Sequence, residues 1–195
     1  MGRWFIALAV CIVCGSAAVG RAQPSPSVCR DEFCFPAQEN VSGVPLTLRG
    51  VSTFRYWGIR VYTGALYLPA SEVSQVAAVG ETPKKLVLRY HRSVSVDQFV
   101  EKSEETLEEH PRLSLQKLRP FLSRMKSLYV PVVEGDVYAM TYQPAQGTLR
   151  LFFNEQLLGE ITDREFASAY FGIWVSDYSV GKEFTDELLG RNSKL

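Results

Sequence analysis

The side chains that most often perform acid–base or nucleophilic catalysis are sparse in this chain. Histidine occurs only as His91 and His110, and neither belongs to a local catalytic pattern. The sequence has no glycine-rich phosphate loop, no serine nucleophile elbow and no zinc-protease motif. Four glutamates, Glu104, Glu105, Glu108 and Glu109, fit the solvated face of a helix. We therefore interpret the histidines and the acidic cluster as structural, and expect no cofactor.

Two cysteines, Cys29 and Cys34, lie close together in the run Cys-Arg-Asp-Glu-Phe-Cys. In an oxidising compartment such a pair forms a disulfide. The alternative is half of a metal site, which would need further ligands, and no second cysteine pair follows in the chain. We favour the disulfide and expect no metal. Because the closed loop is very short, the bond should fasten a terminus and not create the fold.

Aromatic side chains are dense on the expected strands and helix faces. The simplest interpretation of most of them is a hydrophobic core. Tyrosines such as Tyr62 need a hydrogen-bond partner when buried, and Arg55, Arg60 and Arg89 lie nearby in the sequence. An apolar pocket with a few polar groups is the other arrangement these residues allow, and it is typical of a small-molecule site.

Alternating and β-branched residues predict one antiparallel sheet that ends in a meander. The order of strands and helices predicts an α+β fold and not a βαβ array. The expected strands are residues 46–50, 53–57, 59–68, 86–91, 136–143, 148–153 and 157–161.

Two capping boxes predict where the main helices begin. Ser95-Val-Asp-Gln98 opens a helix that runs to about residue 109, and Thr162-Asp-Arg-Glu165 opens one that runs through Trp174. Residues 115–126 predict another helix, bent or restarted at Pro120. Short helices are expected over residues 71–79 and 183–189, the second ended by Gly190.

The N-terminus has the pattern of a cleavable secretory signal over residues 1–22. Arg3 precedes an uncharged apolar run over residues 4–14, and Gly20 and Ala22 fit the small positions of a cleavage site. A retained anchor is the alternative, but the run is shorter than the about 20 residues that span a bilayer. We expect an exported protein, periplasmic or secreted, with no stable membrane anchor after cleavage.

The composition of the exported chain limits which partners and how many domains it can have. Removal of residues 1–22 takes away Arg3 and Arg21, which leaves two more acidic than basic residues. This balance gives no electrostatic footprint for nucleic acid. Residues 23–43 are rich in proline and serine and are expected to be a leader, and residues 44–195 are long enough for one domain with its own core.

A series of short motifs covers residues 44–190, nearly the whole exported chain. The motifs are Leu46-Thr-Leu-Arg-Gly50, Ile59-Arg-Val-Tyr-Thr-Gly-Ala-Leu-Tyr-Leu-Pro69, Ser95-Val-Asp-Gln-Phe99, Glu134-Gly-Asp136, Tyr142-Gln-Pro-Ala-Gln-Gly-Thr148, Phe166-Ala-Ser-Ala-Tyr-Phe-Gly-Ile-Trp174 and Leu188-Leu-Gly190. In this order they resemble the bacterial chalcone isomerase-like family. The resemblance implies a large curved antiparallel sheet packed against several helices, with a ligand cleft between them.

The resemblance also implies a choice of activities. The plant enzymes of this family close a chalcone to a flavanone by adding a phenolate oxygen, while other relatives bind fatty acids. In the enzymes an arginine stabilises the developing negative charge, and threonine, tyrosine and asparagine side chains hold the substrate and a water.

Carried onto this chain, the family's polar positions are mostly occupied by other residues. The arginine position falls on Phe54, with Arg55 one residue later and so on the opposite face of the strand unless a bulge intervenes. The threonine, tyrosine and asparagine positions fall on Tyr62, Phe99 and Thr106. Loss of a positioned donor typically costs about a hundredfold in rate or more.

We therefore expect an exported protein that binds a fatty acid or a similar small apolar or aromatic acid, without chalcone isomerase activity. The expected ligand-binding residues are Phe54, Arg55, Tyr62, Phe99 and Thr106, with Arg55 or another arginine of the cleft pairing the acid. The alternative is an isomerase or intramolecular lyase acting on an unknown enone or phenol, with Arg55 and Tyr62 as catalytic residues. A third possibility is an accessory module whose cleft is filled by its own side chains. Chalcone closure is an intracellular step, so an export signal argues against a true chalcone isomerase.

Overall fold

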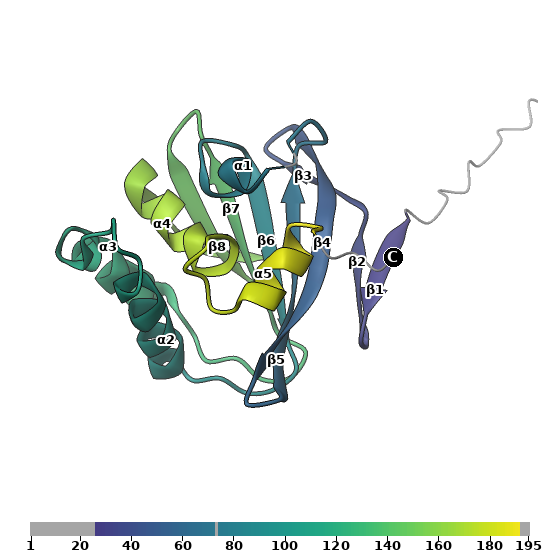
Figure 1. Ribbon diagram of the computed structural model, residues 1–195, viewed down its shortest axis with the longest axis horizontal. Helices are drawn as coiled ribbons and strands as arrows, with labels where there is room; N and C mark the ends of the chain where they lie inside the picture. Colours follow the sequence, from purple (N-terminus) through teal and green to yellow (C-terminus); the bar gives the residue numbers. More distant parts are fainter. Residues whose placement is uncertain (1–25, 73, 192–195) are drawn as a thin grey trace, which may run out of the picture.

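One curved antiparallel sheet forms the centre of the molecule (Figure 1), and the computed structural model describes residues 26–72 and 74–191. Each strand pairs with its neighbour in the sequence, so the sheet is a meander. Side chains alternate between its two faces: Leu86, Leu88 and Tyr90 share a buried face of one strand. The strands in spatial order are β3 (Gln38–Val41), β4 (Val44–Tyr56), β5 (Ile59–Leu68), β6 (Lys84–Tyr90), β7 (Val137–Gln143), β8 (Thr148–Phe153) and β9 (Gln156–Thr162).

Helices cover one face of this sheet (Figure 1), and the main hydrophobic core lies between the helices and the sheet. The helices are α1 (Gln75–Val79), α2 (Val96–Glu108), α3 (Leu115–Leu128), α4 (Arg164–Val175) and α5 (Lys182–Leu188). The expected α+β class, with a curved antiparallel sheet packed against several helices, is confirmed.

The helix starts follow local hydrogen bonds. At α2 the Ser95 capping box is confirmed, because the Gln98 N–H donates to Ser95 Oγ and the Ser95 N–H donates to Gln98 Oε1. At α4 the cap is Asp163, one residue later than the box predicted from Thr162, and it accepts the Phe166 N–H at 2.7 Å. α3 continues through Pro120 without the predicted restart.

Strand β4 is longer than the sequence predicts, because Gly50 does not end it. The predicted strands 46–50 and 53–57 form one strand of 13 residues, with a register shift between Leu48 and Gly50. A Cβ on Gly50 would lie 2.1 Å from the Glu187 carbonyl oxygen and 2.7 Å from that of Leu188. The glycine is therefore needed for the close approach of α5, not for a turn.

The other face of the sheet is covered near β4 and β5 by a two-stranded hairpin of β1 (Ser27–Arg30) and β2 (Phe33–Pro36). The sequence predicts a leader over residues 23–43, but from Ser27 onward this segment is folded. Phe33 and Phe35 alternate toward the sheet and are buried in a second small core, which makes the hairpin part of the domain.

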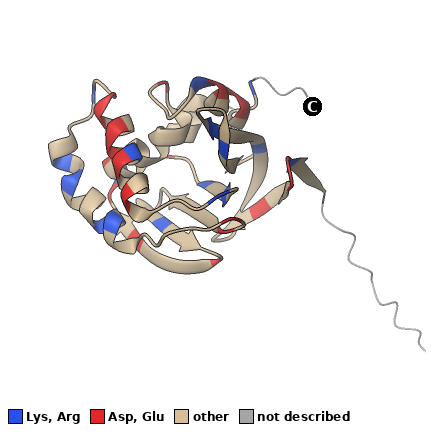
Figure 2. Cartoon of the chain, turned by 90° about the horizontal axis from the view of Figure 1, so that it is seen from below, with Lys and Arg blue, Asp and Glu red and all other residues tan. Residues whose placement is uncertain are grey.

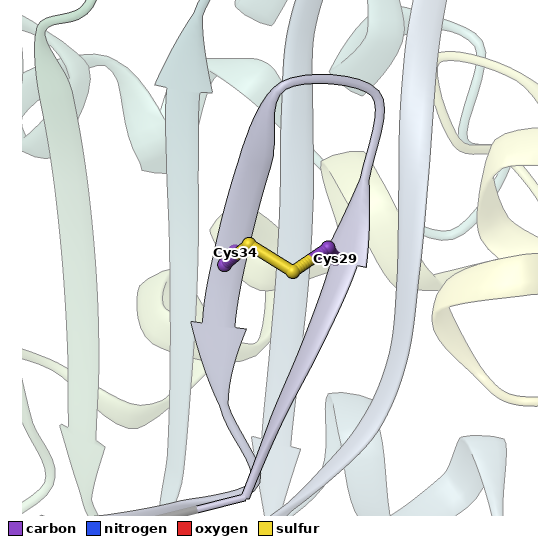
Figure 3. The surroundings of a disulfide bond; sticks show 2 residues. All are labelled: Cys29 and Cys34. Carbon is purple, nitrogen blue, oxygen red and sulfur yellow. A yellow bond between two sulfur atoms is a disulfide. The ribbon is translucent and has the colours of Figure 1, made fainter. Parts of the chain in front are cut away.

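A disulfide joins Cys29 to Cys34 across this hairpin, as predicted (Figure 3). The two residues face each other as a cross-strand pair between β1 and β2. The expected signal over residues 1–22 lies outside the described residues. In the part of the chain that the structure describes, every helix is too short or too polar to cross a membrane.

Candidate functional site

A small cavity lies between the helix-covered face of the sheet and α2 and α4. Its volume is about 30 Å³, which leaves room for roughly two water molecules. Its walls are apolar except for hydroxyl groups, and none of the lining side chains is charged. The lining residues are Leu86, Leu88, Tyr90, Phe99, Ser103, Tyr129, Tyr138, Met140, Leu151 and Trp174.

Strand and helix periodicity place these side chains together. On the sheet side, Leu86 and Leu88 of β6 pair across the ladder with Met140 and Tyr138 of β7, so all four point to one face. On the helix side, Phe99 and Ser103 are four residues apart on α2 and therefore share a face. The cavity is the space left where these two surfaces meet.

Three tyrosine hydroxyls of this region differ in their hydrogen bonding. The Tyr138 hydroxyl is held by the backbone: it donates to the Val130 carbonyl at 2.6 Å and accepts the Val130 N–H at 2.8 Å. The Tyr129 hydroxyl is hydrogen-bonded to that of Tyr170. Within the described residues the Tyr90 hydroxyl has no hydrogen-bond partner, so it is free to meet a ligand.

Burial raises the pKa of these tyrosines further above neutral pH. Desolvation raises the pKa of Tyr90 and Tyr129 well above the ordinary value, and raises the pKa of Tyr138 and Tyr170 to about 12. At neutral pH the hydroxyls are therefore neutral donors. The Tyr90 hydroxyl can donate to a carbonyl, carboxyl or hydroxyl oxygen of a ligand, but none of these tyrosines supplies a positive charge.

The structure brings three of the five predicted ligand-binding residues into this region. Phe99 lines the cavity and stacks on Tyr129 with ring centroids 5.2 Å apart. Tyr62 lies behind the wall: its ring is 5.5 Å from that of Tyr90, and its hydroxyl accepts the Trp174 indole N–H at 3.1 Å. Phe54 stacks on Tyr62 at 5.1 Å, one step further from the cavity.

The other two predicted residues lie elsewhere. A register shift between Phe54 and Arg55 is present, yet Arg55 is exposed, and its charge helps to lower the pKa of Asp31 in the hairpin. Thr106 is buried on α2, where its hydroxyl donates to the Lys102 carbonyl of the preceding turn. Arg55 therefore does not supply a cation to the cavity.

Sequence reasoning missed Tyr90 and Tyr129 as site residues. Tyr90 ends β6, and Tyr129 follows the last residue of α3. The alternation of Leu86, Leu88 and Tyr90 along one strand was the signal for the first. No local pattern marks Tyr129, because its position depends on how α3 packs.

His91 has two side-chain hydrogen-bond partners that could not be predicted from the sequence. Its Nδ1 is 2.8 Å from Glu32 Oε1 in the hairpin, and its Nε2 is 2.8 Å from Thr63 Oγ1. This order of groups is that of a catalytic triad. Thr63, however, is fully buried beneath the hairpin, and the His91 ring is stacked on Phe33, so the hydroxyl has no access to a substrate. The network fastens the hairpin to the sheet.

Comparison with known proteins agrees with this architecture. A family model described as chalcone isomerase-like matches residues 31–190. The fold is similar to the crystal structure of a fatty-acid binding protein from Arabidopsis thaliana, with a TM-score of 0.68 and 14% sequence identity. That match covers 85% of this chain and 96% of the plant protein. No curated protein sequence matches the chain.

Proposed function

This chain belongs to the chalcone isomerase-like family, and from that membership we propose that it is an exported protein that binds a fatty acid or a similar apolar acid and does not close chalcones. The observation that carries the proposal is the cavity, whose walls are apolar side chains and neutral hydroxyls. The fatty-acid binding protein with the same fold supports the same class of ligand.

An acyl chain fits the chemistry of the cavity wall. Leu86, Leu88, Met140 and Leu151 offer aliphatic surface without a charged group. Each methylene moved from water into such surroundings contributes about 0.8 kcal/mol. Affinity should therefore rise roughly fourfold for each added methylene until the cavity is filled.

A ligand of this size must enlarge the cavity. The present cavity volume of about 30 Å³ is smaller than the volume of any fatty acid. Phe99 and Tyr129, which stack on each other at one wall, have to separate for an acyl chain to enter. The cost of opening this stack lowers the affinity for every acid, and the fourfold rise applies to each methylene that enters the opened cavity.

The polar end of the ligand should meet the Tyr90 hydroxyl. Since no lining side chain is charged, the site favours the uncharged form of an acid or a neutral oxygen. A bound carboxyl group should therefore have a raised pKa, and the affinity for a fatty acid should fall as the pH rises above the pKa of the free acid.

Two observations support binding over isomerisation. Arg55 is exposed outside the cavity, and Phe99, at the family's tyrosine position, has no hydroxyl to position a water. Incubation with chalcones and other enones tests the alternative. A rate above background that is lost in Arg55→Ala would contradict the proposal.

Export is supported by the Cys29–Cys34 disulfide, because such bonds persist in oxidising compartments. Cell fractionation with an antibody to the folded domain tests it. Recovery of the protein with the cytoplasmic fraction would contradict export without bearing on the cavity.

Titration of the purified protein with saturated acids of increasing chain length tests the binding proposal. Ser103 on the cavity wall provides a matched pair of variants: Ser103→Phe should fill the cavity and abolish binding, whereas Ser103→Ala should leave affinity within about threefold of wild type. If wild type binds none of the acids, or if Ser103→Phe binds as well as wild type, the proposal is wrong.

A further inference from the structure

Large hydrophobic side chains are exposed mainly at one end of the sheet. Seven such residues are exposed in the described part of the chain, and five of them sit where β4 meets β5, just before β7, and where β8 meets β9. In this meander all three connections lie at the same end. The five residues, which we call the turn patch, are Tyr56, Trp57, Ile59, Val133 and Leu157.

Trp57 is the most exposed of the five, at 86%. It occupies the first position of the two-residue β4–β5 turn, with φ +51°, and Gly58 follows with φ +79°. Such a turn favours asparagine or aspartate before glycine. A bulky aromatic residue with positive φ is strained, so Trp57 costs stability where it stands.

No contact of Trp57 within the described residues offsets this loss of stability. The ring of Trp57 contacts that of Tyr56 edge-on at 6.3 Å, and Tyr56 is itself 56% exposed. A strained, exposed tryptophan with no place in either core is expected to serve a contact outside the molecule.

The turn patch lies at the same end of the sheet as the aromatic wall of the cavity. Tyr90, which ends β6, pairs across the ladder with Tyr62, only three residues from Ile59. The Tyr90 carbonyl accepts the Gly135 N–H, and Gly135 is two residues from Val133. A surface that held the turn patch would therefore lie next to the cavity.

The charges around the turn patch are mixed. Figure 2 looks onto this end and shows acidic and basic residues side by side, on the two helices at the left, on the elements at the top and on several strands. Close to the patch, Arg55 and Arg92 are exposed, as are Glu134 and Glu155. This balance fits a zwitterionic surface better than a strongly charged partner.

We propose that the turn patch inserts into the interface of a lipid bilayer, so that the cavity exchanges its apolar ligand directly with the membrane. Tyrosine and tryptophan favour the boundary between hydrocarbon and headgroups, and an apolar acid is concentrated there. The inference rests on the proposed binding function for its purpose, but the contact itself depends only on the turn patch.

Fluorescence quenching by vesicles of brominated phosphatidylcholine tests the contact. In the protein without the expected signal over residues 1–22, whose apolar run would itself bind vesicles, the difference between wild type and Trp57→Asn isolates the signal of Trp57 from that of Trp174. The bromolipid should quench Trp57, and Trp57→Asn combined with Ile59→Ser should weaken vesicle binding by at least about tenfold. The control Val76→Ser changes an exposed side chain on α1, at the opposite end of the sheet, and should leave binding unchanged.

Trp57→Asn also tells a loss of vesicle binding apart from a loss of folding. Because Trp57→Asn creates a favourable turn sequence, its melting temperature should be equal to or above that of wild type while vesicle binding falls. Equal quenching of wild type and Trp57→Asn, or equal losses in Val76→Ser, would overturn the proposal, as would a dimer in solution that Trp57→Asn dissociates. Acid affinity measured without vesicles should not change in Trp57→Asn, so a failure of the cavity to bind acids is recognised separately.

Discussion

Replacing Tyr90 by phenylalanine separates the part of the site that serves a ligand from the part that serves the fold. The Tyr90 hydroxyl is buried beside the cavity and has no hydrogen-bond partner within the described residues. The hydroxyl borders a cavity with room for about two water molecules, so the fold depends on no hydrogen bond that it makes. Tyr90→Phe should therefore leave the free energy of unfolding of the empty protein unchanged or raise it by about 1 kcal/mol.

Ligand affinity should move in the opposite direction. If the Tyr90 hydroxyl donates to the polar end of the ligand, its loss removes one hydrogen bond worth about 0.5–1.5 kcal/mol. The dissociation constant for a saturated fatty acid should then rise roughly threefold to tenfold. Isothermal titration calorimetry at pH 6 measures the affinity, and urea denaturation measures the stability.

Tyr138→Phe is the matched control, because its hydroxyl makes two hydrogen bonds to Val130. This variant should lose about 2 kcal/mol of stability and should retain its affinity. The reasoning is refuted if Tyr90→Phe loses as much stability as Tyr138→Phe, or if its affinity for every acid equals that of wild type.

Three further predictions concern the scaffold. Gly50→Ala should lower the free energy of unfolding by about 3 kcal/mol, because its Cβ would overlap the backbone of α5; Gly172→Ala, whose Cβ meets only ordinary contacts, should be neutral or stabilising by urea denaturation. Burial lowers the pKa of Lys84 to about 7, so above pH 7 the unfolded state binds one more proton than the folded state. Stability should therefore rise by about 1 kcal/mol per pH unit between pH 7 and 9.5. Lys84→Met should abolish this slope, and an unchanged slope would exclude Lys84 as its source. The hydrogen bond from Thr53 lowers the pKa of Asp31, so wild type should be more stable than Thr53→Val at neutral pH, and this difference should shrink as the pH falls below 3.8. The hydrogen bond between the Thr53 and Thr63 hydroxyls leaves a part that does not depend on pH; a difference of the same size at neutral pH and at pH 2 would show that the bond to the ionised carboxylate does not contribute.

Local patterns predicted most of the fold. The strands of the meander and the start of α2 follow from alternation and from a capping box, which depend on residues close in sequence. Gly50 misled the strand prediction because its role depends on α5, more than a hundred residues away. The hairpin was missed because proline and serine near residue 25 outweighed the alternation of Phe33 and Phe35.

The site was predicted less completely. Phe54, Tyr62 and Phe99 do lie in or behind the cavity wall, but Arg55 turns away from it even though the strand is irregular at that point. The direction of a side chain after a bulge cannot be counted from sequence. In the same way, the partners of His91 come from the hairpin and from β5, and only the folded chain brings them together.

The central claim is that an apolar acid occupies the cavity between α2 and the sheet. A crystal of the protein with a fatty acid brominated at its terminal carbon tests it most directly, because anomalous scattering locates the bromine without ambiguity. We predict a bromine peak enclosed by Leu86, Met140 and Leu151, with the Phe99–Tyr129 stack opened and the carboxyl group within hydrogen-bond distance of Tyr90. A fully loaded protein with the bromine elsewhere, or with this stack still closed, would contradict the account.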